Sequence, residues 1–324
     1  MNKTPFVSVI VPAFNEEKHI AECLSSLLAL DYPKDRYNIT VVDNNSNDNT
    51  ASLIRQFNVQ YLFLERGKVG AVRNYGVKCT ESDIIAFIDA DCIAGKTWLA
   101  SGVEKLKDLD VGAVGGFCRL RDNPGWVEKA WVLGERVGNI EVNNLAGSSF
   151  LLERKMFESL DGFDESINAG EDSKLSAKIT EKGYRLESIE GCAVTHLGYP
   201  NSLVGFAKRQ FWHSSSYLKS NNGIRDRTFV AVVIFIISLL LTFLLALSEN
   251  NFLALASFFV SVLVSVSFTI KRSLMGAYRK IYPANLFSAF FIDYVYFLSR
   301  ALGLAFSFKL FFSPIKLQSD NKSR

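Results

Sequence analysis

Short apolar runs alternate with amphipathic segments over roughly the first 200 residues. Strand-like runs rich in β-branched and aliphatic side chains occur at residues 7–12, 39–42, 61–64, 84–88 and 111–117. After the first run, apolar residues recur at helical spacing at Ile20, Cys23, Leu24, Leu27 and Leu28. Asn15 precedes this helix and is expected to act as its N-cap. The alternation predicts an α/β domain with a mostly parallel sheet, flanked on both faces by helices.

The composition becomes largely apolar after Arg227. Residues 230–247 and 252–270 are uncharged, and each stretch approaches the roughly 20 residues needed to cross a bilayer. We therefore predict a catalytic domain of residues 1–224 and a C-terminal helical membrane region of residues 225–324, with spans at about 229–248 and 252–270. The apolar segment at about 286–312 contains Asp293, Arg300 and Lys309, which leaves open a third span or an interfacial helix.

The basic residues predict an orientation in the membrane. Lys and Arg flank the two uncharged stretches, whereas the connecting residues 248–251 contain neither. The positive-inside rule then predicts a multi-pass protein of the inner cell membrane with its catalytic domain in the cytoplasm. We expect no secretory signal at the N-terminus, where the chain leads directly into a strand. The net charge of +3 and the absence of a basic run interleaved with aromatic residues argue against nucleic acid.

Acidic residues follow the predicted strands. Asp43 ends the second run, and Asp89 and Asp91, separated by the small Ala90, end the fourth. In open α/β sheets ligands bind beyond the carboxyl ends of the strands. Alternate residues of an extended chain point the same way, so both carboxylates can face one hard cation. A solvated Asp-rich turn is the structural alternative.

Other cofactor signals are weak. No G-x-G-x-x-G motif follows the first strand, which argues against a nicotinamide or flavin dinucleotide. The cysteines are odd in number and lack zinc-ligand spacing: Cys23, Cys79, Cys92, Cys118 and Cys192. We expect them to be reduced and mostly buried, and no structural zinc is predicted.

Five motifs occur in order along the chain: VIVPAFNE at 9–16, VVDNNS at 41–46, AVRN at 71–74, FIDAD at 87–91 and GED at 170–172. With this set the chain resembles the family 2 glycosyltransferases of the GT-A fold, over about residues 7–217. The resemblance implies a Rossmann-like domain that binds a nucleotide-diphosphate sugar and a divalent metal, Mn²⁺ or Mg²⁺. It also implies that the nucleotide pocket is lined by Pro12, Ala13, Asn15 and Glu16.

The same resemblance implies roles for the later motifs. Asp43 would accept hydrogen bonds from the base or ribose, and Arg73 and Asn74 would lie near the uracil or diphosphate. Asp89 and Asp91 would bind the ribose and the metal.

The GED motif precedes a helix whose apolar stripe is predicted from Leu175 and Ile179. In the family the matching aspartate is the general base, so the resemblance implies catalysis by Asp172 with Glu171 beside it. An attacking acceptor hydroxyl must lose its proton, and direct displacement of the diphosphate inverts the anomeric carbon. The structural alternative is a carboxylate that offsets the helix dipole.

Further candidates lie in the second half of the domain. His196 either completes the metal site or is a hydrogen-bonded histidine at a strand end. The sequence KRQFW at 208–212 partly resembles the Q-x-x-R-W element of processive synthases, which implies Arg209 near the diphosphate; Phe211 replaces the arginine, which argues against processivity. Trp126 and Trp131, on a predicted helix, either contact the acceptor or pack in the core.

Together these features predict a metal-dependent, inverting glycosyltransferase of the hexosyltransferase type in cell-surface polysaccharide or glycoconjugate synthesis. The expected donor is a UDP-sugar, although no residue distinguishes UDP from GDP, and the expected acceptor is a hydroxyl of a lipid-linked glycan. A polyprenyl-phosphate glycosyltransferase is one alternative, but a phosphate with a second pKa of about 6 is already ionised and needs no base. A non-catalytic nucleotide-sugar-binding membrane scaffold is the other.

Overall fold

The computed structural model describes residues 4–134, 137–214, 227–275 and 283–312. The chain divides into two compact units, one of residues 1–201 with 272–285 and one of residues 202–271 with 286–324. The predicted domain boundary between residues 224 and 225 lies outside the described residues.

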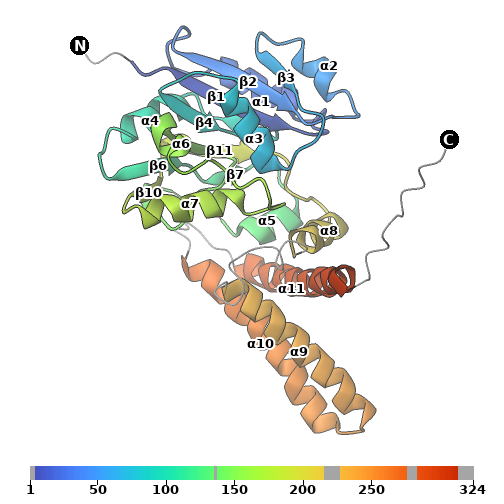
Figure 1. Ribbon diagram of the computed structural model, residues 1–324. Coiled ribbons are helices and arrows are strands. Elements are labelled where there is room, and N and C mark those ends of the chain that lie inside the picture. The colour runs from blue at the N-terminus through green and yellow to red at the C-terminus, as the bar shows by residue number, and fades with distance from the viewer. Residues whose placement is uncertain (1–3, 135–136, 215–226, 276–282, 313–324) are drawn as a thin grey trace, which may run out of the picture. The chain divides into compact units, whose positions relative to one another are not determined.

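The first unit is built around an eight-stranded sheet (Figure 1). Its strands, in spatial order, are β3 (Gln60–Phe63), β2 (Tyr37–Asp43), β1 (Val7–Ala13), β4 (Ile84–Phe87), β9 (Phe150–Glu153), β6 (Val111–Gly115), β10 (Arg185–Ser188) and β8 (Ile140–Val142). Neighbouring strands from β3 to β4 are parallel, while β9 runs antiparallel between β4 and β6 and β8 runs antiparallel to β10. The sheet is thus mostly parallel, which confirms the predicted α/β class.

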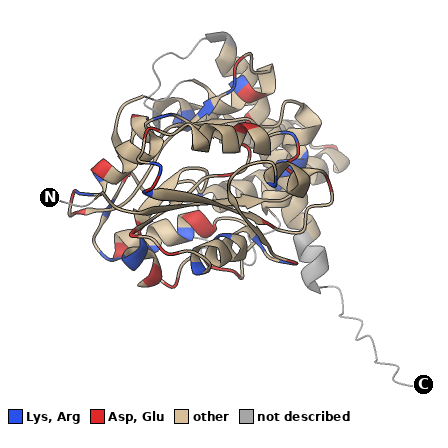
Figure 2. Ribbon diagram, turned by 90° about the horizontal axis from the view of Figure 1, so that it is seen from above, with Lys and Arg blue, Asp and Glu red and all other residues tan. Residues whose placement is uncertain are grey.

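Helices cover both faces of this sheet. They are α1 (Ile20–Leu28), α2 (Thr50–Ile54), α3 (Val69–Lys78), α4 (Trp98–Lys105), α5 (Trp126–Val132), α6 (Arg154–Glu158) and α7 (Glu171–Glu181), with a short 3₁₀ turn at Glu190–Cys192. Side chains alternate along a strand, so Val9 enters the core with α1 and α4, and Ile10 enters the core with α6 and α7. Charged residues lie mainly on the helices and loops around the strands (Figure 2).

The first helix differs from the prediction at both ends. It begins at Ile20 after His19, so the prediction that Asn15 caps it is wrong. Asn15 instead has a φ of +56°, a left-handed conformation that a short polar side chain tolerates. At the other end Leu28 is 37% exposed, whereas Ile20 and Leu24 are fully buried. The buried stripe is therefore confirmed except at Leu28, which falls outside the covered face.

A second, three-stranded sheet lies beyond the end of β4. It consists of β5 (Cys92–Ala94), β11 (Val194–His196) and β7 (Cys118–Leu120), with β11 in the middle. β11 pairs antiparallel with β5 and parallel with β7. This small sheet joins the chain just after the DAD motif to the chain around His196.

The second unit is helical over the residues that the structure describes. It contains α8 (Leu203–Ser214), α9 (Arg227–Leu247), α10 (Asn251–Met275) and α11 (Pro283–Phe312), of which α10 and α11 each extend by a few residues into the first unit. Among the described residues, α9, α10 and α11 are long and apolar enough to cross a membrane.

The helix α11 contacts α9 and α10 around residues 293–297. Phe297 packs on Phe235 of α9 and Phe268 of α10, with ring centroids 5.5 and 5.3 Å apart. Asp293, which interrupts the apolar segment in sequence, is fully buried and accepts a hydrogen bond of 2.7 Å from the hydroxyl of Thr269. The buried carboxyl group therefore has a polar partner on a neighbouring helix.

Candidate active site

The loops after β1 and β2 form one side of the site. Ala13 and Asp43 end these strands and lie opposite each other in the parallel register. Asp43 is almost fully buried, and its two carboxylate oxygens accept hydrogen bonds from Ser46 N (3.0 Å) and from the Tyr61 hydroxyl (2.9 Å). Burial and the Asp43 carboxylate both raise the pKa of Tyr61, so its hydroxyl remains a donor. These two hydrogen bonds fix the Asp43 carboxylate at the carboxyl end of β2.

Asn15 and Glu16 join the two loops. The backbone N–H of Asn15 donates to Ser46 Oγ, and Asn15 Oδ1 accepts from Asn47 N, both at 2.9 Å. The N–H of Glu16 donates to Thr50 Oγ1 at 2.7 Å. The structure therefore brings Pro12, Ala13, Asn15, Glu16 and Asp43 to one edge, where the resemblance predicts the nucleotide pocket.

Arg73 of α3 connects the DAD motif to α7. Arg73 is 2% exposed, and its guanidinium makes ion pairs with Asp89 Oδ1 at 2.7 Å and Glu171 Oε1 at 2.5 Å. It also lies over the ring of Phe163, at 5.4 Å from the ring centroid. A Cβ at Gly147 would stand 2.4 Å from Arg73 Nη2, so a side chain at this position would displace the guanidinium. The proximity of Arg73 to the diphosphate stays a prediction.

Negative groups outnumber positive groups in this cluster, because three carboxylates (Asp89, Glu171 and Asp172) surround the one guanidinium of Arg73. Burial tends to lower the pKa of Arg73, but Asp89 and Glu171 outweigh it and raise that pKa, so the arginine stays charged. Burial raises the pKa of Glu171 above its usual value despite the attraction of Arg73, and the nearby Asp172 adds to the shift. A proton is therefore retained more readily on Glu171 than on an exposed glutamate.

The side-chain amide of Asn74, the neighbour of Arg73, forms hydrogen bonds with the loop before α7. Its Nδ2 donates to Phe163 O and to Glu165 Oε1, both at 2.9 Å, and its Oδ1 accepts from Phe163 N at 3.0 Å. Asn74 thus fixes the loop that leads to the GED motif. Its predicted nearness to the uracil or diphosphate stays a prediction.

Asp172 lies in the first turn of α7, which begins after Gly170 with a φ of +87°. Its Oδ2 accepts a hydrogen bond from Gly147 N at 3.0 Å, and its Oδ1 accepts one from Ser173 N at 2.7 Å. Two backbone donors therefore set the orientation of this half-buried carboxylate. Leu175 and Ile179 are buried below it, which confirms the predicted stripe.

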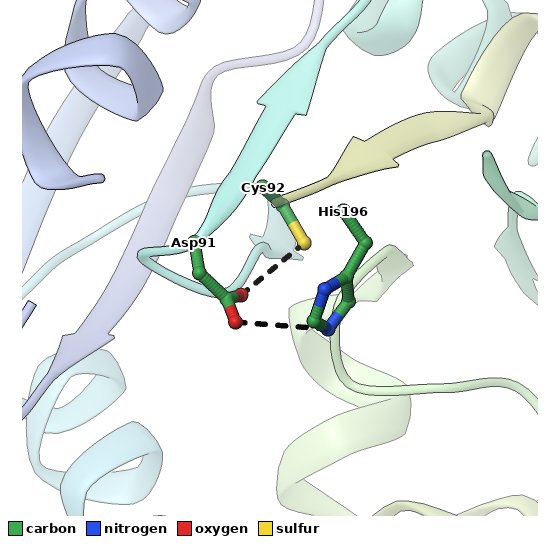
Figure 3. A group of neighbouring side chains, drawn as sticks. All are labelled: Asp91, Cys92 and His196. Carbon is green, nitrogen blue, oxygen red and sulfur yellow. Dashed lines mark hydrogen bonds and ion pairs between the residues drawn. The ribbon is translucent and has the colours of Figure 1, made fainter. Parts of the chain in front are cut away.

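Asp91 and His196 meet where the small sheet begins, and Cys92 joins them (Figure 3). Asp91 Oδ2 lies 3.7 Å from His196 Nε2, and Asp91 Oδ1 lies 3.6 Å from Cys92 Sγ. One ligand atom from each of the three residues lies within 4.8 Å of the others. Asp89 lies outside this group and forms an ion pair with Arg73, so the predicted role of Asp89 as a metal ligand stays a prediction. An oxygen, a nitrogen and a sulfur donor at this spacing fit a divalent ion.

Cys92 is the residue that the sequence analysis missed. The spacing of the cysteines carried no metal signal, because its partner is a histidine on a distant strand. Its position directly after the DAD motif was the available signal. Burial, followed by the charges of Asp91 and Asp89, raises the pKa of the Cys92 thiol, which is neutral when no metal is bound.

A cavity of about 350 Å³ lies beside these groups. It is lined by Phe117, Trp131, Asn144, Leu145, Ala146 and Tyr199 among others. Tyr199 stacks on the ring of His196 with centroids 4.3 Å apart, and Ala146 precedes the Gly147 that donates to Asp172. Two lining residues of the cavity are therefore neighbours of the site: Tyr199 contacts His196 of the metal group, and Ala146 lies next to the residue that donates to the predicted base. Trp131 faces it, whereas Trp126 is half exposed.

Arg209, the remaining predicted site residue, lies on α8 in the second unit. In the same helix, burial lowers the pKa of His213 to about 4, and the nearby Arg300 and Arg209 add to this shift. The predicted contact of Arg209 with the diphosphate stays a prediction.

Comparison with known proteins identifies the class. Residues 8–160 match the model of the glycosyl transferase family 2. The glycosyltransferase AglE of Haloferax volcanii is 32% identical over 202 residues, which cover 58% of this chain and 66% of AglE. The poly-beta-1,6-N-acetyl-D-glucosamine synthase of Staphylococcus aureus is 28% identical over 235 residues, covering 65% of this chain and 56% of the synthase. The chain thus spans about half to two thirds of such relatives.

A solved structure shares the fold. The mannosyltransferase PcManGT from Pyrobaculum calidifontis, in complex with GDP-Man and Mn²⁺, superposes with a TM-score of 0.60 at 21% identity, covering 94% of this chain and 88% of PcManGT. The chain therefore carries a family 2 glycosyltransferase domain with the GT-A fold, as its motifs predict.

Proposed function

We propose that this chain transfers a sugar from a nucleotide-diphosphate sugar to a hydroxyl of a lipid-linked glycan, with inversion at the anomeric carbon. One observation carries the proposal: Arg73 ties the DAD motif to the helix that holds Asp172, through ion pairs of 2.7 and 2.5 Å. A donor-binding motif and a candidate base are thereby fixed relative to each other. The Staphylococcus aureus relative, a polysaccharide synthase by name, supports a role in surface glycan synthesis.

The donor would bind at the edge formed by the loops after β1 and β2. Asp43 would accept hydrogen bonds from the base or ribose, while Asn15 and Glu16 keep the two loops together. Asn74 and Arg209 are the further candidates for contacts to the nucleotide and its diphosphate. A UDP-sugar remains the expected donor. Because PcManGT was solved in complex with GDP-Man, GDP-sugars are tested as donors alongside UDP-sugars.

Asp91 and His196, with a contribution from Asp89, would hold Mn²⁺ or Mg²⁺. When bound, such a cation neutralises charge on the leaving diphosphate. Gly198 leaves room for this arrangement, because a Cβ there would stand 1.9 Å from Asp91 Oδ2. The carboxylate of Asp91 can therefore adopt its position only beside a residue without a side chain.

Asp172 would remove the proton from the attacking hydroxyl. The backbone N–H groups of Gly147 and Ser173 keep its carboxylate in one orientation, which favours proton transfer from a bound acceptor. The acceptor sugar would occupy the adjacent cavity, where the ring of Trp131 can stack on an apolar sugar face. Attack from this side displaces the diphosphate directly, which inverts the anomeric carbon.

The membrane region fits a lipid-linked acceptor. The helices α9, α10 and α11 would hold the chain in the cell membrane, with the catalytic domain in the cytoplasm. We propose that α11 lies at the membrane interface rather than spanning the bilayer with α9 and α10, because Asp293, Arg300 and Lys309 interrupt its apolar sequence.

The test is release of nucleoside diphosphate by detergent-purified protein from a panel of UDP- and GDP-sugars. Assays contain Mn²⁺, Mg²⁺ or EDTA, with membrane lipid extract as acceptor. We expect metal-dependent release from one donor, lost in Asp91→Asn and Asp172→Asn. Glu181→Gln is the matched control, since it is exposed on the same helix and about 14 Å from Asp172 along the axis.

Two outcomes would replace the proposal. Donor binding without release would support the non-catalytic scaffold. Transfer to a polyprenyl phosphate that survives in Asp172→Asn would support the phosphate acceptor, because an ionised phosphate needs no base.

A further inference from the structure

A thiol belongs to the group of donors at the start of the small sheet. Cys92, the first residue of β5, pairs directly with His196, the last residue of β11, across the antiparallel ladder. Directly opposed residues project their side chains from the same face of a sheet. Asp91 precedes Cys92, and its carbonyl accepts a hydrogen bond from Leu197 N at 2.8 Å, which closes this end of the ladder. The three side chains consequently point toward one another (Figure 3).

Their separations are close to those of a metal ligand shell. With Zn–O and Zn–N bonds near 2.0 Å and a Zn–S bond near 2.3 Å, tetrahedral angles place oxygen and sulfur about 3.5 Å apart and oxygen and nitrogen about 3.3 Å apart. The structure has 3.6 Å from Asp91 Oδ1 to Cys92 Sγ and 3.7 Å from Asp91 Oδ2 to His196 Nε2. Small side-chain rotations would therefore bring one ion into contact with all three.

We propose that Asp91, Cys92 and His196 form a binding site for a thiophilic divalent ion of the Zn²⁺ type, with Cys92 as a sulfur ligand. Cys92 and His196 are buried, and Asp91 is partly exposed, so the fourth coordination position is open toward solvent. Binding exchanges one ion for the proton of the Cys92 thiol, which passes to the solvent.

This site differs in chemistry from one for Mn²⁺ or Mg²⁺. Those ions prefer oxygen ligands, so they would use Asp91 and leave the thiol protonated. Zn²⁺ accepts sulfur, nitrogen and oxygen together, and its bond to a thiolate favours it at this position. Because both kinds of ion need Asp91, they exclude each other. A consequence that rests on the proposed function is that Zn²⁺ inhibits sugar transfer in competition with Mn²⁺.

The test uses the full chain, purified in detergent, stripped of metal and loaded with Co²⁺ alone. A thiolate bound to Co²⁺ produces a charge-transfer band in the near ultraviolet, and this readout requires no sugar donor. We expect the band in the wild type and in Cys79→Ser, whose cysteine is exposed, and its loss in Cys92→Ser. Cys92→Ser should also lower Zn²⁺ affinity at least about tenfold and leave Mn²⁺ affinity unchanged.

A second measurement covers the case in which Cys92→Ser does not fold. X-ray absorption at the zinc edge of the Zn²⁺-loaded wild type should show one sulfur neighbour at about 2.3 Å. Nitrogen and oxygen neighbours only, or a Co²⁺ band that persists in Cys92→Ser, would overturn the proposal. A protein that shows the band but transfers no sugar would refute the proposed function and leave the metal site intact.

Discussion

Arg73 allows a quantitative test of how the site is held together. Substitution of Arg73 by Met keeps much of the volume and removes the charge that faces Asp89 and Glu171. Removing one partner of a buried ion pair typically costs about 3–5 kcal/mol, because the remaining charge is buried without compensation. Glu171 is 5% exposed, so we expect the unfolding free energy of Arg73→Met to fall by this amount. Arg119→Met is the control, since its pair with Glu190 is half exposed and worth at most about 1 kcal/mol.

The loss should depend on pH in a defined direction. The folded-state pKa of Glu171 already lies above its unfolded value, because burial outweighs the attraction of Arg73. Without Arg73 this pKa rises further, so the folded variant binds more protons than the unfolded chain. Its stability therefore falls as pH rises through the folded pKa. The loss of unfolding free energy in Arg73→Met relative to wild type should be smaller at about pH 5 than at about pH 8.

Urea unfolding in detergent, followed by tryptophan fluorescence, measures both effects. Addition of Glu171→Gln to Arg73→Met should recover part of the lost stability, because it removes one of the stranded charges. A loss of unfolding free energy in Arg73→Met no larger than that in Arg119→Met, or a loss that grows toward acid pH, would show that Arg73 does not stabilise buried carboxylates.

Three further substitutions test the rest of the site. Gly198→Ala should lower Mn²⁺ affinity about 10–100-fold, measured by electron paramagnetic resonance titration, because its methyl group would displace the Asp91 carboxylate; unchanged affinity would contradict this. Asp43→Asn should weaken nucleotide binding about tenfold or more in calorimetry, as expected for loss of charged hydrogen bonds. Trp131→Ala should raise the acceptor KM about 2- to 12-fold in transfer kinetics, whereas a change in the donor KM would place the ring elsewhere.

The sequence pattern predicts the local elements well because each depends on neighbouring residues. The buried runs that became β1 and β4 and the stripe of Leu175 and Ile179 on α7 are confirmed. The sequence does not decide the role of Asn15, because its side-chain oxygen serves a helix cap or a loop contact equally well, and only the position of Asn47 selects the loop contact.

Long-range pairing accounts for what the pattern did not show. The antiparallel β9 between β4 and β6 has no signal of direction in its four residues. The ladder that sets His196 opposite Cys92 joins segments from distant parts of the chain, and no local spacing encodes it. β4 ends at Phe87, so the alternation expected for Asp89 and Asp91 does not extend to them, and the two carboxylates meet different partners.

In the proposed reaction Asp172 takes the acceptor proton at a metal-dependent donor site. The most direct measurement compares kcat for sugar transfer to lipid extract by Asp172→Asn and Glu181→Gln at saturating donor and Mn²⁺. We expect a kcat about 10²–10⁴-fold lower in Asp172→Asn, with wild-type donor affinity, and an unchanged kcat in Glu181→Gln. Equal kcat values for the two variants would contradict it.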